Sequence, residues 1–367
     1  MVKSIYFVVD WGKDKPRAWS GTNWSLFNAL KKRMDFFDID TTAKDSLKSR
    51  LLRKAHLIPR DMGMEHNVVG RNIALPVIEK NGKKDAVFQF SEMIPDSLGM
   101  PTYIYFDMSV DAVGDLQKRF PDVFKESNYK GCVRSVVIKR TERQNEYLRN
   151  CAGAFTMGEW LAKDLVERCG LPKEKVHHVG GGINLDKTLI DYSKKQGNKF
   201  LFVGRDFVRK GGPLVYKAYK LLQKKHPNFE LHVAGPMENP YPNDTDPNYH
   251  FYGDCPYKKT AELFNLADVF VMPSKFEAYG LVFVEALTFG LPCIGRNAYE
   301  MPYLINEGET GYLLKEETPE QLAALMESAI TKQELTKNVR ARKEEYLVEY
   351  SWDKVAERIE QAMFPKK

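Results

Sequence analysis

Two glutamates, Glu277 and Glu285, lie where the sequence predicts a strand, a loop and a helix in close succession. The apolar run Val269–Met272 predicts a buried strand, and the spacing of apolar residues over Tyr279–Phe289 predicts a helix after it. Gly280 then stands at the start of that helix, where unpaired backbone amides attract phosphate. The two carboxylates either serve this anion site together or are an unrelated surface glutamate and helix glutamate.

A basic loop rich in glycine follows the predicted strand Phe200–Val203. It holds the cations Arg205, Arg209 and Lys210 among the glycines Gly204, Gly211 and Gly212. Such a loop favours a diphosphate, because Arg grips two oxygens at once and Lys adds a point charge. It matches neither the Walker loop nor the dinucleotide fingerprint. A basic surface loop without a ligand is the alternative.

A third candidate, Trp19–Trp24, follows the predicted strand Ser4–Val9 and opens a helix. Gly21 lets the backbone approach a ligand, and the helix start adds amide donors. The alternative is an ordinary helix that Ser20 or Thr22 caps.

Asp107 is a fourth candidate, because it ends the apolar strand predicted over Thr102–Phe106. A carboxylate at the carboxyl end of a strand can orient a ligand hydroxyl, or it can cap the next helix. The seven histidines form no metal-ligand pattern, and no Ser–His–Asp order or Gly-x-Ser-x-Gly elbow is present.

Length and composition indicate a two-domain globular protein. The chain has 367 residues, with 43% hydrophobic and 28% charged residues. Its net charge of +6 suits small anionic ligands or an anionic membrane surface. We find no nucleic-acid-binding module and expect no nucleic-acid partner.

Cysteine usage and the amino-terminal residues predict a cytoplasmic protein. The five cysteines are scattered without a Cys-x-x-Cys pair, which argues against a zinc site and a disulfide framework. The segment Met1–Asp10 predicts a first strand and not a signal peptide, and no apolar run approaches the ~20 residues of a membrane span.

Strand and helix patterns alternate along the whole chain, which predicts an α/β fold with two doubly wound, Rossmann-like parallel sheets. The polar segment Asp191–Asn198 predicts a linker between them. We therefore expect a first domain over 1–190, a second over 191–350, and ligands beyond the carboxyl ends of the strands. Two such sheets facing each other would form a cleft.

A basic segment over residues 44–60 stands apart from this pattern. Its cations accompany several leucines, so it is either a helix that docks on anionic lipid or a solvated helix of the first domain. The second interpretation is favoured because no Trp or Phe anchors the apolar face.

The two best candidates together resemble a known family. Arg205 and Lys210-Gly, followed by Glu277-x7-Glu285, resemble the donor-binding signature of the retaining glycosyltransferases of family 4, which have the GT-B architecture. Further stretches resemble weaker motifs of that family: Phe155–Ala162, Val179–Asn184, Met301–Leu313 and Ser351–Asp353.

The resemblance implies roles at the matching positions of the second domain. Arg205 and Lys210 would hold the donor diphosphate. Glu285 would bind the ribose hydroxyls, and Glu277 would lie beside the donor sugar. Backbone amides at the helix start would meet the sugar and phosphate, namely those of Tyr279, Gly280 and Leu281.

In the first domain, the resemblance makes Gly21 and Thr22 the counterpart of the family's glycine-rich loop. The usual Gly-Gly-x-Gly is reduced to Ser20-Gly21-Thr22, and the family's first-domain His is absent, with Asp107 in its place. A final helix over 351–367 would cross back onto this domain. Residues 40–150, where acceptor specificity usually resides, resemble the family only weakly.

The resemblance thus implies a retaining, metal-independent transferase without a cofactor. It would move a sugar from a UDP- or GDP-sugar to a saccharide, lipid-linked or protein acceptor in glycan or polysaccharide biosynthesis, at the cytoplasmic face of a membrane or free of it. A nucleotide-sugar epimerase of similar shape and a non-catalytic nucleotide-sugar-binding subunit remain the alternatives.

Overall fold

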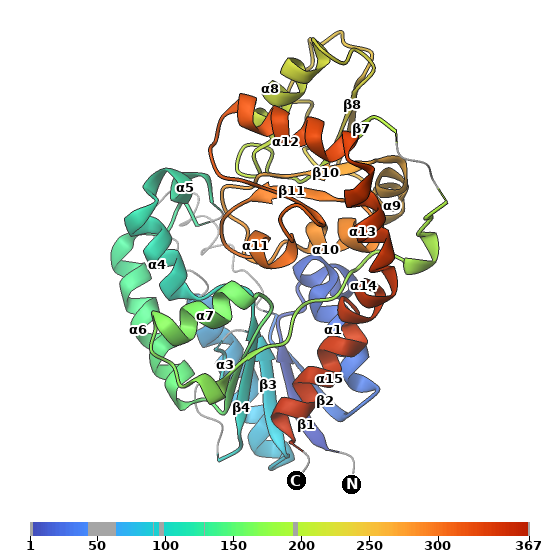
Figure 1. Cartoon of the computed structure of the whole chain (residues 1–367). Coiled ribbons are helices and arrows are strands. Elements are labelled where there is room, and N and C mark those ends of the chain that lie inside the picture. The colour runs from blue at the N-terminus through green and yellow to red at the C-terminus, as the bar shows by residue number, and fades with distance from the viewer. Residues whose placement is uncertain are drawn as a thin grey trace. The chain divides into compact units, whose positions relative to one another are not determined.

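A computed structural model describes residues 3–42, 64–90, 92–94, 99–127, 129–193 and 197–365. The chain forms two compact units (Figure 1). The first comprises Met1–Gly182 together with Trp352–Lys367, and the second comprises Ile183–Ser351. The predicted basic segment at 44–60 lies outside the described residues.

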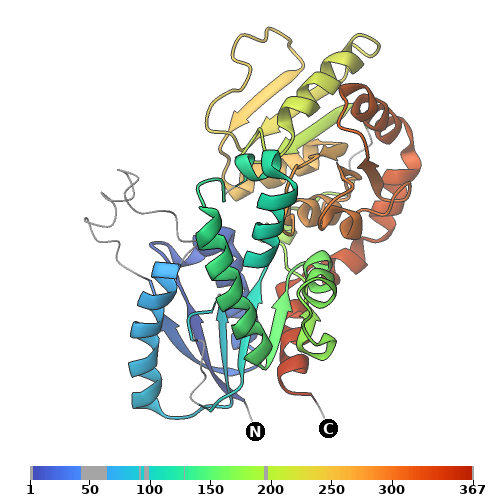
Figure 2. The ribbon, with the colours of Figure 1, turned by 90° about the vertical axis from the view of Figure 1, so that its left-hand side faces the viewer.

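The first unit contains a six-stranded parallel sheet in the order β2-β1-β3-β4-β5-β6. Its strands are β1 Ser4–Val9, β2 Asp35–Asp40, β3 Ala86–Phe90, β4 Thr102–Phe106, β5 Gly153–Thr156 and β6 Val176–His178. The crossover helices are α1 Thr22–Lys31, α3 Met64–Asn81, α4 Val110–Arg119, α5 Pro121–Glu126, α6 Arg134–Asn150 and α7 Glu159–Glu167 (Figure 2).

Stacked aromatic rings connect the strands of this sheet. Phe7 on β1 stacks on Phe36 of β2 and on Phe88 of β3, with ring centroids 5.3 and 5.5 Å apart. Phe88 in turn stacks on Phe155 of β5 at 6.2 Å. Offset stacking of buried rings adds to the free energy of apolar burial, so this row contributes strongly to the core.

The last helix of the chain, α15 Trp352–Met363, packs on α1 in this first unit. Its apolar face is buried, and the Arg358 guanidinium donates to the Val179 carbonyl at 3.3 Å. Gly182 lies against it so closely that a Cβ atom there would come within 2.6 Å of the Trp352 nitrogen. The sequence prediction of a final helix that returns to the first domain is confirmed.

The second unit contains another six-stranded parallel sheet, in the order β12-β11-β10-β7-β8-β9. Its strands are β7 Lys199–Val203, β8 Glu230–Ala234, β9 Tyr249–Gly253, β10 Val269–Val271, β11 Cys293–Arg296 and β12 Gly311–Leu314. The helices are α8 Gly212–Gln223, α9 Tyr257–Leu266, α10 Leu281–Thr288, α11 Met301–Leu304, α12 Pro319–Thr331, α13 Gln333–Ala341 and α14 Lys343–Glu349. The predicted α/β class with two parallel sheets is correct.

The polar segment predicted as a linker belongs to the second unit. The backbone N–H of Asp191 donates to Asn265 at 3.0 Å, and the Tyr192 hydroxyl donates to the Thr288 carbonyl at 2.6 Å. The units instead divide after Gly182 and after Ser351. Low hydrophobicity without periodicity is typical of a packed surface loop as well as of a linker, and the described residues Asp191 and Tyr192 are packed.

Removing the buried side chain of Ile359 tests how firmly α15 is part of the first unit. We expect Ile359→Ala to lower the free energy of unfolding by about 2–5 kcal/mol, because this side chain is fully buried. Urea denaturation followed by circular dichroism measures the change.

Gln361→Ala is the matched control, because Gln361 is exposed on the same helix and its loss should change stability by less than about 0.5 kcal/mol. Equal stability of both variants would show that α15 does not contribute its apolar face to the unit.

Candidate functional site

The candidate site of the second unit lies at the switch point of its sheet. β7 lies between β8 and β10 in the sheet. After β7 the chain continues to its neighbour β8 on one side, and after β10 it continues to β11 on the other side. Open α/β sheets bind ligands beyond the carboxyl ends of such strands. Both predicted segments, the basic loop after β7 and the glutamate loop after β10, begin there.

The two loops touch through a glycine. Gly211 has a φ of +81°, and a Cβ atom on it would come within 2.5 Å of the Pro273 carbonyl oxygen. The backbone N–H of Lys275 donates to the Arg209 carbonyl at 2.9 Å and ties the same loops together. A side chain at residue 211 would force the loops apart, so glycine is needed for both its conformation and its lack of bulk.

This contact brings Lys210 and Glu277 together. The Lys210 ammonium lies 3.2 Å from Glu277 Oε2, and both side chains are largely buried, with 15% and 13% exposure. Gly204 lies against the stem of Lys210, where a Cβ atom would come within 2.3 Å of Cδ. The structure therefore unites three residues that sequence reasoning had placed in two separate motifs.

Arg209 is one of the three cations that the sequence analysis assigned to the diphosphate loop, but the family resemblance gave it no role. Its buried guanidinium donates to Asp206 at 3.1 Å and to the Phe276 carbonyl, and it lies 3.9 Å from Glu277 Oε2. Arg209 therefore fixes the position of the glutamate loop through its bond to the residue before Glu277. The signal that could have found it is the same cluster of cations, but sequence alone does not show which of three cations points inward.

Arg205 lies at the exposed rim of this loop. Its guanidinium pairs with Asp254, the residue after β9, at 3.1 and 3.3 Å, and 79% of its side chain is exposed. Arg205 and Lys210 thus lie on the same loop but have different partners, and their shared role in binding a diphosphate stays a prediction.

A helix begins beside Gly280, as predicted, but its first residue differs from the predicted one. Gly280 is the left-handed N-cap, with a φ of 88°, and α10 begins at Leu281 and not at Tyr279. No side chain caps this end. The Phe283 amide donates to the Gly280 carbonyl at 2.8 Å, and backbone amides at a helix start can bind an anion. The Tyr279 side chain is buried.

Glu285 lies on α10 as a buried carboxyl group. Burial raises its pKa to about 7, although the Asn184 backbone amide and the Lys210 charge oppose the shift. A carboxylate that is costly to bury alone is ready to accept hydrogen bonds from a ligand.

In the first unit, the predicted loop before α1 is conformationally strained. Trp19 and Ser20 have positive φ angles of 46° and 56°, and Gly21 continues the series as the N-cap of α1. Neither Ser20 nor Thr22 caps the helix, so that alternative was wrong. Strained backbone of this kind persists at ligand sites. Asn23, to which the sequence analysis gave no separate role, is buried there, and its Oδ1 has no hydrogen-bond partner among the described residues.

Asp107 follows β4 and is half-buried. It does not cap the next helix, because the Ser109 hydroxyl accepts from the Ala112 amide at the start of α4. The capping alternative for Asp107 is therefore excluded.

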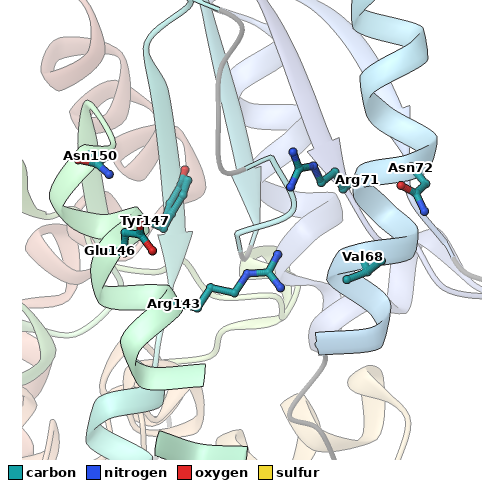
Figure 3. A pocket seen from close by; sticks show the side chains of 7 residues that line it. All are labelled: Val68, Arg71, Asn72, Arg143, Glu146, Tyr147 and Asn150. Atoms are coloured by element: carbon teal, nitrogen blue, oxygen red, sulfur yellow. The ribbon is translucent and has the colours of Figure 1, made fainter. Parts of the chain in front are cut away.

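A separate hollow of about 720 Å³ lies in the first unit between α3 and α6 (Figure 3). Arg71 and Arg143 extend into it from the two helices, and Tyr147 contributes to its wall. None of the predicted site residues lines this hollow.

Residues 190–346 match the family model described as "Glycosyl transferases group 1". This match spans nearly all of the second unit, including both loops and α10. This match, which covers less than half of the chain, makes the second unit similar to group 1 glycosyltransferase domains.

Curated relatives share this region at low identity. An uncharacterized 41.2 kDa protein in the cps region of Klebsiella pneumoniae is 28% identical over 168 residues, which are 43% of this chain and 47% of that protein. A D-inositol 3-phosphate glycosyltransferase of Corynebacterium kroppenstedtii is 32% identical over 141 residues, or 35% of this chain and 31% of its own. The match thus spans half or less of the length of these relatives.

Solved structures match the whole chain. WaaG, a glycosyltransferase involved in lipopolysaccharide biosynthesis, aligns with a TM-score of 0.67 at 16% identity, over 99% of this chain and 100% of its own. Sucrose-phosphate synthase from Thermosynechococcus elongatus aligns with the same TM-score and identity over 98% of both chains. The chain therefore has the GT-B fold of these glycosyltransferases. None of its described helices has the length and apolarity to span a membrane.

The buried Glu285 predicts a pH-dependent stability. Its pKa is raised from 4.5 to about 7 in the folded protein, so its ionisation destabilises the fold increasingly between those pH values. Glu285→Gln should therefore raise the free energy of unfolding at pH 8 by up to about 3 kcal/mol and change it little near pH 4.5.

Urea denaturation at the two pH values measures this difference. Glu316→Gln serves as the control, since Glu316 is exposed in the same unit and should show no such pH dependence. A Glu285→Gln variant that is equally destabilised at both pH values would refute the buried-charge explanation.

Proposed function

We propose that the protein is a retaining glycosyltransferase that moves a sugar from a nucleoside-diphosphate sugar to an acceptor hydroxyl. The observation that supports this most is the Lys210–Glu277 pair at the switch point of a group 1 glycosyltransferase domain. It places a cation and a carboxylate beside an uncapped helix start, as a charged donor with a polar sugar requires.

The charge of a diphosphate leaving group would account for the cations near the start of α10. When the bond to the sugar breaks, negative charge develops on the diphosphate. Lys210 and the amides at the start of α10 would stabilise that charge in a largely buried site without a metal ion. Glu277 balances the Lys210 charge, and the three-donor ammonium can also bond to a phosphate oxygen.

Arg205 would complete the diphosphate site by changing partner. Its side chain is exposed, so releasing Asp254 costs little, and a phosphate offers the same two-oxygen geometry as the carboxylate.

The two glutamates then have different tasks. Glu285, buried on α10, would accept hydrogen bonds from the ribose hydroxyls, and Glu277 would orient the donor sugar. Neither acts as a nucleophile. The acceptor would attack from the face that the leaving group occupies, its proton passing to a donor phosphate oxygen, so the configuration at the anomeric carbon is retained. The transition state would have oxocarbenium character.

The first unit would receive the acceptor, with Gly21, Thr22 and Asp107 at the carboxyl edge of its sheet. Solved neighbours include HepE in complex with UDP and glucose and the pneumococcal transferase GtfA in complex with UDP and GlcNAc. UDP-sugars are therefore the first donors to test, followed by GDP-sugars. The acceptor would be a saccharide, a lipid-linked glycan or a protein in cytoplasmic glycan or polysaccharide biosynthesis.

A donor panel tests the proposal. The intact protein is incubated with UDP-, GDP- and ADP-sugars, with and without saccharide and lipid-linked acceptors, and release of nucleoside diphosphate is followed. Acceptor-stimulated release is expected with one donor, and NMR of the product should show a retained anomeric configuration. Conversion of the donor sugar without release would favour an epimerase. Binding without turnover would favour a non-catalytic subunit.

Lys210 is the most direct residue to change. We expect Lys210→Ala to lower kcat/KM at least about 100-fold, because a buried cation at the leaving group is lost. Lys217→Ala, which removes an exposed lysine from α8, should leave the rate unchanged. A Lys210→Ala variant that keeps its circular dichroism spectrum and its activity would refute the assigned role.

A further inference from the structure

Two histidines and a glutamate gather on one face of the second sheet, away from the loops of the donor site. Glu230 and His232 lie two positions apart on β8, so their side chains share a face. His250 on β9 is the register partner of His232 and lies on the same face. The cluster belongs to β8 and the edge strand β9.

The spacing of the three groups suits a metal ion. Glu230 Oε2 lies 3.1 Å from His232 Nε2 and 3.4 Å from His250 Nε2, and one ligand atom of each residue lies within 4.8 Å of the others. Bonds of 2.0–2.1 Å in a tetrahedral zinc site put neighbouring ligand atoms roughly 3.3 Å apart. The glutamate is thus already at the right separation from both rings.

Neighbouring side chains orient these ligands. The Tyr252 hydroxyl lies 2.9 Å from His232 Nδ1, so a proton on Nδ1 would leave Nε2 with the lone pair that a metal needs. The Lys199 ammonium lies 2.6 Å from Glu230 Oε1, which leaves Oε2 to bind an ion alone. His250, with 35% of its side chain exposed, is at the open side of the cluster.

We propose that Glu230, His232 and His250 bind one divalent transition-metal ion, for which Zn²⁺ is the reference, with a water molecule as the fourth ligand. Two imidazoles and one carboxylate are ligands that zinc accepts. The two rings stack with an angle of 21° and centroids 4.5 Å apart, so the exposed His250 ring must turn to aim Nε2 at the ion.

The bound ion would cross-link the edge strand β9 to β8, a link called the clasp below. β9 leads directly to Asp254, the partner of Arg205, so the clasp would steady one wall of the donor site without touching the donor. The proposal does not depend on transferase activity, because its test measures metal and stability.

The test uses the intact protein after chelation and dialysis, with Zn²⁺ alone as the probe. Calorimetry and elemental analysis should give one ion per chain. Saturation to a hundredfold excess over Kd should raise the midpoint of thermal unfolding by roughly 5–10 °C. His250→Gln and Glu230→Gln should each weaken binding at least about tenfold.

His226→Gln is the matched control, because His226 forms a single pair with Glu327 at 2.7 Å in the same unit and should not affect zinc binding. No stoichiometric zinc, or equal affinity in His250→Gln and the unaltered protein, would overturn the site. Stoichiometric binding without a shift of the midpoint would overturn the clasp.

Discussion

The close approach of two loops at the switch point of the second sheet is the constraint on which the proposed donor site depends. Gly211 can lie against Pro273 only because it has no side chain and adopts a positive φ. That contact brings the Lys210 ammonium into an ion pair with Glu277. The buried Arg209 guanidinium stabilises the glutamate loop by donating to the Phe276 carbonyl. The buried carboxyl of Glu285 is costly to ionise, and a ligand that donates hydrogen bonds to it would offset that cost.

The two units contribute unequally to this account. The second unit presents the paired, largely buried charges of Lys210 and Glu277 within the segment that matches a group 1 glycosyltransferase model. The first unit presents a strained loop and a carboxyl at a strand end, which fit acceptor binding but do not name the acceptor. Charge that must be stabilised on a diphosphate demands particular groups, whereas hydroxyl acceptors are recognised by shape and many interchangeable polar contacts.

Sequence patterns predicted the second unit well because its strands are short apolar runs bounded by glycine and proline. They failed over α3 and α6 in the first unit. Pro76 interrupts the pattern of α3, and α6 carries polar residues around most of its circumference. The Lys210–Glu277 pair and the Glu230–His232–His250 cluster join distant segments, so only tertiary structure reveals them.

Calorimetric titration with UDP, GDP and ADP tests the central claim most directly, because it measures diphosphate binding without any knowledge of the sugar or acceptor. The account predicts that one of them binds with 1:1 stoichiometry and that Lys210→Ala weakens its affinity at least about tenfold. Failure of all three to bind, or unchanged affinity in Lys210→Ala, would contradict a donor site built on the contact between these two loops.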